Sequence, residues 1–148
     1  ECGIIAAGVA GLGRDARLVV LKDMSLQARP EVWAARVAEA FDAVDADWVV
    51  AEANQGGDMV RAVLQAAAPD LPIRLVHASR GKRARAEPGA ALYARGRVRH
   101  AGRLPALEDQ MCAFGAPDQH GSPDRVDALV WAIAALTPQA ASPRLRRL

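Results

Sequence analysis

Trp48-Val49-Val50-Ala51-Glu52-Ala53-Asn54-Gln55-Gly56-Gly57-Asp58 is a short apolar run that leads a carboxylate directly into a Gly-Gly turn. Residues 48–52 are predicted to form a strand, and the apolar stripe after the glycines predicts a helix from residue 58 to about residue 68. Strand, glycine turn and helix make half of a βαβ unit. Packing does not explain a charge at the end of a buried strand, so Glu52 is the first candidate functional residue.

The segments before this stretch predict a hairpin and a helix. Residues 2–10 and 16–22 are β-compatible runs on either side of a Gly-rich turn, which favours an antiparallel pair. Pro30 is expected in the first turn of a helix at residues 31–44, where apolar residues recur at intervals of three and four.

The segments after it continue the alternation of strands and helices. Residues 73–77 are expected to form a strand parallel to residues 48–52, because a helix connects the two. The polar, basic segment 79–87 is interpreted as an exposed loop, with Pro88 beginning the next helix. Residues 97–100 fit an edge strand or a hairpin arm, and residues 104–114 are weakly helical.

The last strong element is a helix that begins at Ser122-Pro123-Asp124, with Ser122 as the expected N-cap. Asp127 lies one turn inside this apolar helix. On a helix, Asp124 and Asp127 project in the same direction.

This pattern predicts one α/β domain at residues 1–138 and a mobile basic tail at residues 139–148 that could add phosphate contacts. Of the 148 residues, 51% are hydrophobic but 4% are aromatic, so we expect a core of Ala, Val and Leu around three Trp anchors. Because residue 1 is Glu and a strand follows almost at once, the sequence is interpreted as a piece of a longer polypeptide.

Two further features bear on the compartment. Cys2 and Cys112 match neither a disulfide framework nor a metal-ligand spacing, which favours reduced thiols in an intracellular protein. The sequence contains neither a signal peptide nor an apolar run of membrane length, so no membrane association is expected.

The net charge of +2 conceals an uneven distribution. Residues 1–60 carry five basic and ten acidic side chains, whereas residues 61–148 carry fourteen basic and seven acidic ones. Within residues 80–103 there are eight Lys or Arg side chains and one Glu, a density that suits a polyanion such as nucleic acid. A solvated basic face is the alternative interpretation.

Glu52 and Asp127 are the main candidates for chemistry. They lie 75 residues apart, and a hard divalent cation collects carboxylates of this kind from separate elements of an α/β fold. Two Mg²⁺ or Mn²⁺ ions bridged by carboxylates can activate a water and stabilise the leaving oxygen in phosphodiester cleavage. Acidic residues at the centre with basic residues around them indicate a nuclease, and Asp124 is a possible additional ligand.

Several other polar residues have simpler explanations. For three acids the structural interpretation is favoured over that of a ligand: Asp124 as a helix-start charge, Asp58 as a first-turn acid and Asp23 as a strand-end turn residue. The three histidines have no spacing that suggests a zinc site. Gly81-Lys82 lacks the flanking residues of a nucleotide-triphosphate loop.

Five blocks of the sequence resemble, in order and spacing, the C-terminal nuclease domain of phage large terminase subunits, including those of prophage-like and gene-transfer-agent clusters. The resemblance covers nearly the whole chain. The blocks are Glu52-Ala53-Asn54-Gln55-Gly56-Gly57-Asp58-Met59-Val60, Gly81-Lys82-Arg83-Ala84-Arg85-Ala86-Glu87-Pro88, Leu92-Tyr93-Ala94-Arg95-Gly96-Arg97-Val98-Arg99-His100, Leu107-Glu108-Asp109-Gln110-Met111 and Ser122-Pro123-Asp124-Arg125-Val126-Asp127-Ala128-Leu129.

The resemblance implies an RNase H-like mixed β-sheet flanked by helices and a metal-dependent endonuclease that cuts concatemeric double-stranded DNA in the cytoplasm of a bacterial host. It implies as partners an N-terminal ATPase domain of the same full-length chain, a portal and a small terminase subunit. Glu52 and Asp127 match two of the family's metal-binding carboxylates. Lys82, Arg83 and Arg85 match a basic loop near the site, for which contact with DNA phosphates is a reasonable role.

The sequence departs from the family pattern in one respect. The family's first metal-binding Asp lies on a central strand that precedes residues 2–10, and nothing here matches it, including Glu1 and Asp23. The sheet is therefore expected to leave a gap, to borrow a strand or to rearrange. Two alternatives stay open: a DNA-binding or assembly module with an incomplete carboxylate set, and a resolvase-like nuclease on the same fold.

Overall fold

The computed structural model describes residues 1–11, 13–53, 57–116 and 122–137. Strands and helices alternate along most of the chain, as the sequence predicts. In order, the main elements are β1 (Ile5–Ala10), β2 (Arg17–Asp23), α1 (Pro30–Ala43), β3 (Val49–Glu52), α2 (Gly57–Ala67), β4 (Ile73–Val76), α3 (Lys82–Ala94), β5 (Val98–His100), α4 (Pro105–Ala113) and α5 (Asp124–Leu136).

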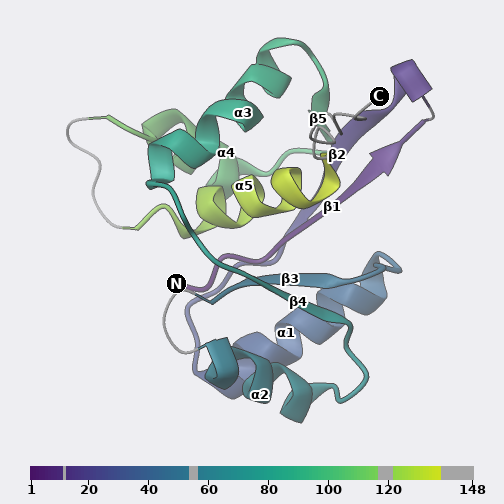
Figure 1. Ribbon diagram of the computed structural model, residues 1–148, viewed down its shortest axis with the longest axis vertical. Helices are drawn as coiled ribbons and strands as arrows, with labels where there is room; N and C mark the ends of the chain where they lie inside the picture. The colour runs from purple at the N-terminus through teal and green to yellow at the C-terminus, as the bar shows by residue number, and fades with distance from the viewer. Residues whose placement is uncertain (12, 54–56, 117–121, 138–148) are drawn as a thin grey trace, which may run out of the picture.

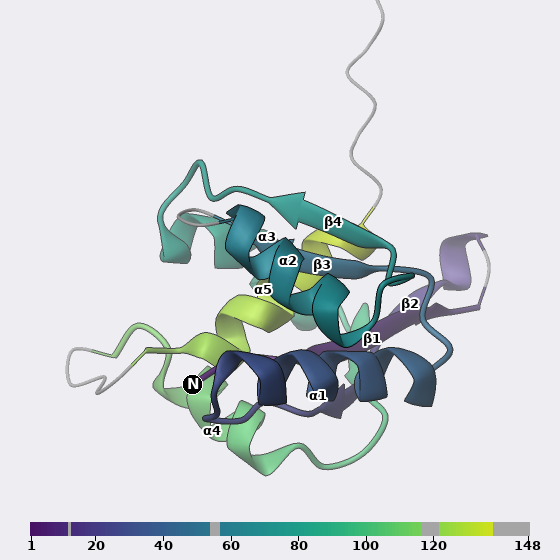
Figure 2. The same cartoon turned by 90° about the horizontal axis from the view of Figure 1, so that it is seen from below.

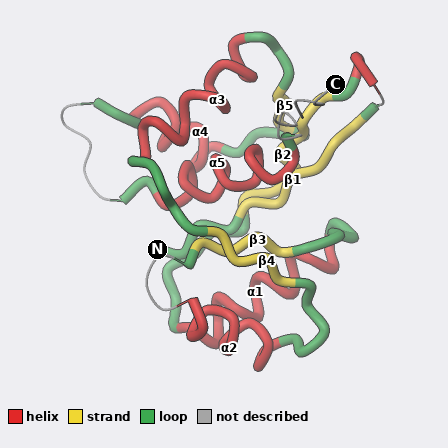
Figure 3. Tube along the Cα trace, in the orientation of Figure 1, coloured by secondary structure: helices red, strands yellow, loops and turns green. Residues whose placement is uncertain are grey.

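The strands form two separate sheets, which are drawn in yellow in Figure 3. In the first sheet, β2 is central, antiparallel to β1 and parallel to β5. In the second sheet, β3 and β4 are parallel, with Glu52 opposite Val76. The predicted hairpin, the parallel pair and the edge strand are confirmed, and the single mixed sheet is divided by a gap.

Helices cover the two sheets from different sides (Figure 1). Helices α1 and α2 pack together on one side of the β3–β4 pair, whereas α3, α4 and α5 gather over the three-stranded sheet. Helix α5 contacts β1, β2 and β3, so it connects the two sheets. Figure 2, seen from below, shows α1 and α2 on the near side of the molecule.

One continuous apolar core lies on the side of the three-stranded sheet. Its fully buried members come from β2, β5, α4 and α5, and Tyr93, Met111 and Phe114 are among the side chains that pack against it. These members are Val20, Val98, Leu107, Val126, Leu129 and Ile133. The hydrophobic effect therefore stabilises this half mainly through aliphatic side chains, as the composition predicts.

The three tryptophans are not the core anchors that the composition suggested. Trp33, Trp48 and Trp131 are all half-buried, and all three line one cavity. Trp is large and is therefore rarely fully buried; the buried helix positions here carry smaller side chains, such as Ala34 and Leu64.

Two predicted helices begin where expected. Pro30 occupies the first turn of α1, where its missing N–H costs no hydrogen bond. Helix α2 begins at Gly57, where a Cβ atom would come within 2.7 Å of the Ala53 Cβ. The glycine is thus required for the close approach of helix and strand, as the Gly-Gly turn suggested.

Two boundaries differ from the prediction. Residues 79–87 were expected to be a loop ending at Pro88, but α3 begins at Lys82 and contains Pro88. The basic residues lack an apolar periodicity, and this first part of the helix is instead fixed by ion pairs with acids on other elements. At α5 the N-cap position is Pro123 rather than Ser122, whose hydroxyl bonds to the Asp124 side chain instead of the backbone.

Some predictions fall outside the described residues. These include the tail at residues 139–148 and most of the loop before Ser122. None of the described helices is both long and apolar enough to span a membrane.

Candidate acidic site

Glu52 and Asp127 come together although they lie on different elements. Glu52 is the last residue of β3, and Asp127 lies in the first turn of α5. The Arg85 guanidinium bridges them, with Nη1 3.2 Å from Glu52 Oε1 and Nη2 3.7 Å from Asp127 Oδ1. The two carboxylates singled out by sequence therefore belong to one site.

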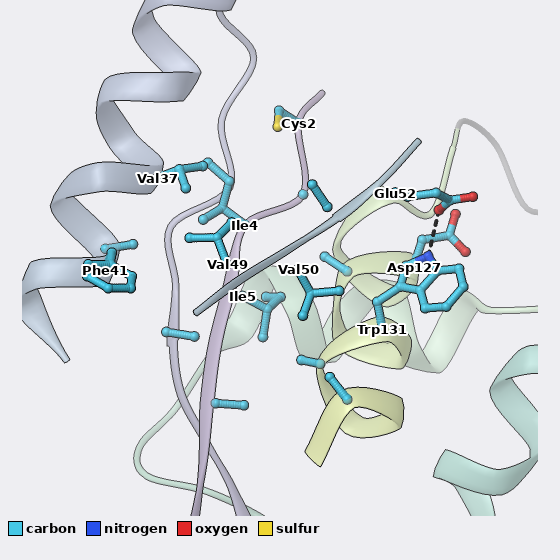
Figure 4. A pocket seen from close by; sticks show the side chains of 18 of the residues that line it. Cys2, Ile4, Ile5, Val37, Phe41, Val49, Val50, Glu52, Asp127 and Trp131 are labelled. Atoms are coloured by element: carbon cyan, nitrogen blue, oxygen red, sulfur yellow. Dashed lines mark hydrogen bonds between the residues drawn. The ribbon is translucent and has the colours of Figure 1, made fainter. Parts of the chain in front are cut away.

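Trp131 is a third side chain of this site, and the sequence analysis did not identify it. Its indole Nε1 donates a hydrogen bond of 2.7 Å to Glu52 Oε2, the dashed line in Figure 4. Its ring also lies 5.1 Å from the Arg85 guanidinium carbon, in the range of a cation–π contact. The available signal was spacing, because Trp131 lies one helical turn after Asp127.

Lys82 adds a second cation. Its Nζ lies 2.6 Å from Asp127 Oδ2 and 3.4 Å from the Ser122 hydroxyl. Lys82 and Arg85 are three residues apart on α3, so helix formation puts both on the face that meets the acids. The loop that was predicted for these residues would not by itself put both side chains on one face.

Arg83, the remaining predicted DNA contact, points elsewhere. Its Nη2 donates a hydrogen bond of 2.6 Å to the Gly115 carbonyl. Arg83 and Lys82 are both exposed, whereas the Arg85 side chain is 11% exposed. Within the predicted basic set, two side chains are thus open to solvent and one is enclosed by the acids.

Asp124 has partners of its own. It accepts a hydrogen bond from Ser122, and its Oδ2 lies 3.4 Å from the amino group of Glu1. Burial, with a smaller contribution from Asp124, raises the pKa of the nearby Cys2 thiol. Cys2 is therefore held as the neutral thiol and not as a nucleophilic thiolate.

Asp23 takes part in fixing the start of α5. The Arg125 guanidinium donates hydrogen bonds to the Asp23 and Glu1 carboxylates. Asp23 Oδ1 also accepts from the Ser25 backbone N–H, as expected of a strand-end turn residue. Asp58 is exposed in the first turn of α2, in keeping with its interpretation as a helix-start acid.

His100 has a structural role. Its Nδ1 lies 3.0 Å from Glu108 Oε1 and its Nε2 lies 2.8 Å from the Tyr93 hydroxyl. The hydrogen bond from His100 and the one from the Leu104 backbone lower the pKa of the Glu108 carboxyl. His77 is exposed.

A cavity of about 610 Å³ lies next to the acidic site. Its walls come mainly from β1, β3, α1 and α5, with single residues or pairs from α2 and α3. In Figure 4, Val37 and Phe41 of α1 lie on one side and Asp127 and Trp131 of α5 on the other. Within the described residues, β1 pairs with β2 alone and β3 with β4 alone, so each has an edge with no strand partner. Of the three outcomes expected for the sheet, the described residues therefore show a gap, which is a cavity between β1 and β3.

The side chains of the acidic site fit a divalent cation in part. Among the described residues, no three His, Cys, Asp or Glu side chains form a group that could hold a metal ion. Mg²⁺, however, is commonly bound through one or two protein carboxylates together with waters and substrate phosphates. Glu52 and Asp127 supply oxygens of this type, so the residues present fit such an ion in part.

The fold and site define an α/β domain with a carboxylate pair where the end of a parallel strand meets a packed helix. The family model described as "Terminase RNaseH-like domain" matches residues 7–136. The chain belongs to this family, and its RNase H-like fold and its resemblance to a terminase nuclease domain are confirmed. No curated protein and no solved structure matches the chain significantly.

Proposed function

We propose that the chain is the endonuclease domain of a DNA-packaging terminase, cutting double-stranded DNA with Mg²⁺ or Mn²⁺ held by Glu52 and Asp127. The observation that carries the proposal is the convergence of these two carboxylates, from β3 and α5, in a chain of the terminase RNaseH-like family. Bound there, two divalent cations would activate the attacking water and stabilise the leaving oxygen.

The chain's own residues would orient the site and bind the substrate. Trp131 fixes one oxygen of Glu52 through the indole N–H, leaving that carboxylate in one orientation. Lys82 and Arg83, both exposed at the start of α3, would contact backbone phosphates, Lys82 beside Asp127 and Arg83 further from the acids. Such contacts carry no sequence information, which agrees with cutting that depends little on sequence.

A third acid would complete the site from residues outside those described. Among the described residues, β1 and β3 each have an edge without a strand partner and both line the cavity, so an extended segment between them would restore one continuous sheet. Such a segment would lie beside Glu52, since β3 ends there. Asp124 is the alternative third ligand, through a rotation away from Ser122.

The test is cleavage of supercoiled plasmid DNA in the presence of Mn²⁺. It uses this chain and a longer one that includes the upstream residues implied by the resemblance. Glu52→Gln and Asp127→Asn should each reduce cleavage by at least about a hundredfold, as for removal of one catalytic electrostatic group. The surface variants Glu39→Gln and Asp70→Asn, which neutralise exposed carboxylates, are the matched controls. Cleavage by both site variants at the parental rate would refute the assignment.

A second candidate is a DNA-binding or assembly module without activity. It is favoured by the absence of a three-acid group among the described residues. Calorimetric titration with Mn²⁺ separates the two proposals. Tight Mn²⁺ binding that depends on Glu52 contradicts the inactive module, whereas DNA binding without metal binding supports it.

A further inference from the structure

We propose that Arg85 is the resident counter-ion of the Glu52–Asp127 pair and that it yields these carboxylates when a divalent cation binds. The inference rests on the proposed function, because it assumes that the two acids bind metal. It assigns to Arg85 a positioning role in place of the DNA contact expected from the sequence.

The first observation is the position of the guanidinium. Arg85 lies between the two carboxylates, with one nitrogen directed at each. Two acids whose oxygens share one cation would repel each other without it. The space between them is also where a metal ion bridging Glu52 and Asp127 would lie, so the guanidinium and the metal compete for the same oxygens.

The second observation is that the guanidinium is poorly satisfied for a buried group. Its side chain is 11% exposed, and its Nε has no hydrogen-bond partner in the described structure. The contact with Glu52 is a single hydrogen bond of 3.2 Å, and the 3.7 Å approach to Asp127 is too long for one. A well-built Arg–carboxylate pair is bidentate and shorter, so this one is held loosely.

The third observation is that neighbouring groups allow the exchange without disturbing Glu52. Trp131 holds the other Glu52 oxygen independently of Arg85. The indole ring also offers the guanidinium a face along which to move. Lys82, whose side chain is 49% exposed, neutralises Asp127 from the solvent side and is a secondary counter-ion.

The sign of the effect on metal affinity distinguishes a competing cation from a structural one. Arg85→Gln removes the competing cation and should bind Mn²⁺ about tenfold more tightly than the parent. A tenfold change in affinity corresponds to the free energy of about one charge-assisted hydrogen bond. Arg85→Lys, whose compact ammonium cannot span both acids, should fall between the two. Arg95→Gln, which removes an exposed arginine at the end of the same helix, should leave the affinity unchanged.

The measurement is Mn²⁺ titration of the 148-residue chain, followed by calorimetry and by tryptophan fluorescence, since all three tryptophans line the cavity. Thermal melting gives a second readout, because Arg85→Gln should melt below the parent in chelator and recover part of that deficit in Mn²⁺. A deficit that stays the same in both conditions indicates a purely structural arginine and overturns the inference.

Failure of this inference can be told apart from failure of the proposed function. If the parent binds Mn²⁺ through Glu52, as shown by loss of binding in Glu52→Gln, but Arg85→Gln binds equally or more weakly, only the counter-ion role is wrong. If Glu52→Gln binds Mn²⁺ as the parent does, the metal site itself is wrong and both proposals fall. If neither the parent nor Arg85→Gln binds Mn²⁺, the counter-ion role is wrong for this chain, and cleavage by the longer chain decides the proposed function separately.

Discussion

The two sheets of this domain differ in what they pack against. The three-stranded sheet faces a continuous core in which Val20 and Leu107 are almost completely buried. The two-stranded sheet instead lines a cavity, and the last residue of β3, Glu52, directs its carboxylate at the Arg85 guanidinium. The larger continuous core therefore lies in one half, and the Glu52–Asp127 pair lies where that core is interrupted.

Leu107→Ala should produce the largest loss of stability, because Leu107 is 0% exposed in the core of the three-stranded half. Leaving a cavity there should lower the free energy of unfolding by about 3 kcal/mol. Val37→Ala, on the wall of the existing cavity, should cost about 1 kcal/mol or less, because part of that side chain is already unpacked. Urea denaturation measures both, and equal losses would contradict the contrast between the two halves.

Gly3→Ala tests the contact between the segment before β1 and the start of α5, beside the cavity. A Cβ at Gly3 would come within 2.0 Å of the Asp124 carbonyl oxygen, so either this segment or the start of α5 has to move. We expect a loss of about 2 kcal/mol in the free energy of unfolding, typical of overpacking, and a shift in Trp131 emission.

Gly102→Ala is the control for this substitution, since nothing lies within 4 Å of a Cβ placed there. Its effect should stay within about 0.5 kcal/mol. If Gly3→Ala is as mild as Gly102→Ala, the close contact between the segment before β1 and α5 is not part of the stable structure.

How far the site could be predicted from sequence depended on whether the signal was local. Glu52 and Asp127 were found because each interrupts an apolar pattern within its own element. Trp131 and Gly3 were missed because their roles consist of contacts with residues 79 or more positions away. Each looks ordinary in its own segment.

The error at α3 has the same origin. Its first two turns carry Lys82 and Arg85 in place of an apolar stripe, so periodicity predicted a loop. The ion pairs that fix this part of the helix reach Glu52 and Asp127, which a local pattern does not reveal. The divided sheet, in contrast, was one of three outcomes expected from the resemblance, which implied a central strand preceding residues 2–10.

Ala132→Leu examines the cavity directly. Ala132 lines it from α5, so a leucine has room, and the free energy of unfolding should change by no more than about 0.5 kcal/mol. Ala34→Leu, at a fully enclosed position of α1, should cost about 1 to 3 kcal/mol from overpacking. Urea denaturation measures the free energy of unfolding of both variants. A large loss of stability in Ala132→Leu would mean that the cavity is closed in solution.

The smallest expected effect lies in the closed half and concerns Tyr93, the chain's one tyrosine. Burial, and to a lesser extent the Glu108 carboxylate, raises the pKa of its phenol from 10.0 to about 12. Since the pKa is raised in the folded protein, the stability that this residue contributes is complete below pH 10 and is lost as the pH rises towards 12.

Ultraviolet absorbance of the phenolate reports this pKa without interference from another tyrosine. The folded chain should titrate near pH 12 and the urea-unfolded chain near pH 10. Glu108→Gln removes the neighbouring charge but not the burial, so it should lower the pKa of Tyr93 only in part. A titration of the folded chain near pH 10 would mean that water reaches Tyr93 despite its contacts with His100 and the core. The three-stranded half would then be more accessible to solvent than its packing indicates.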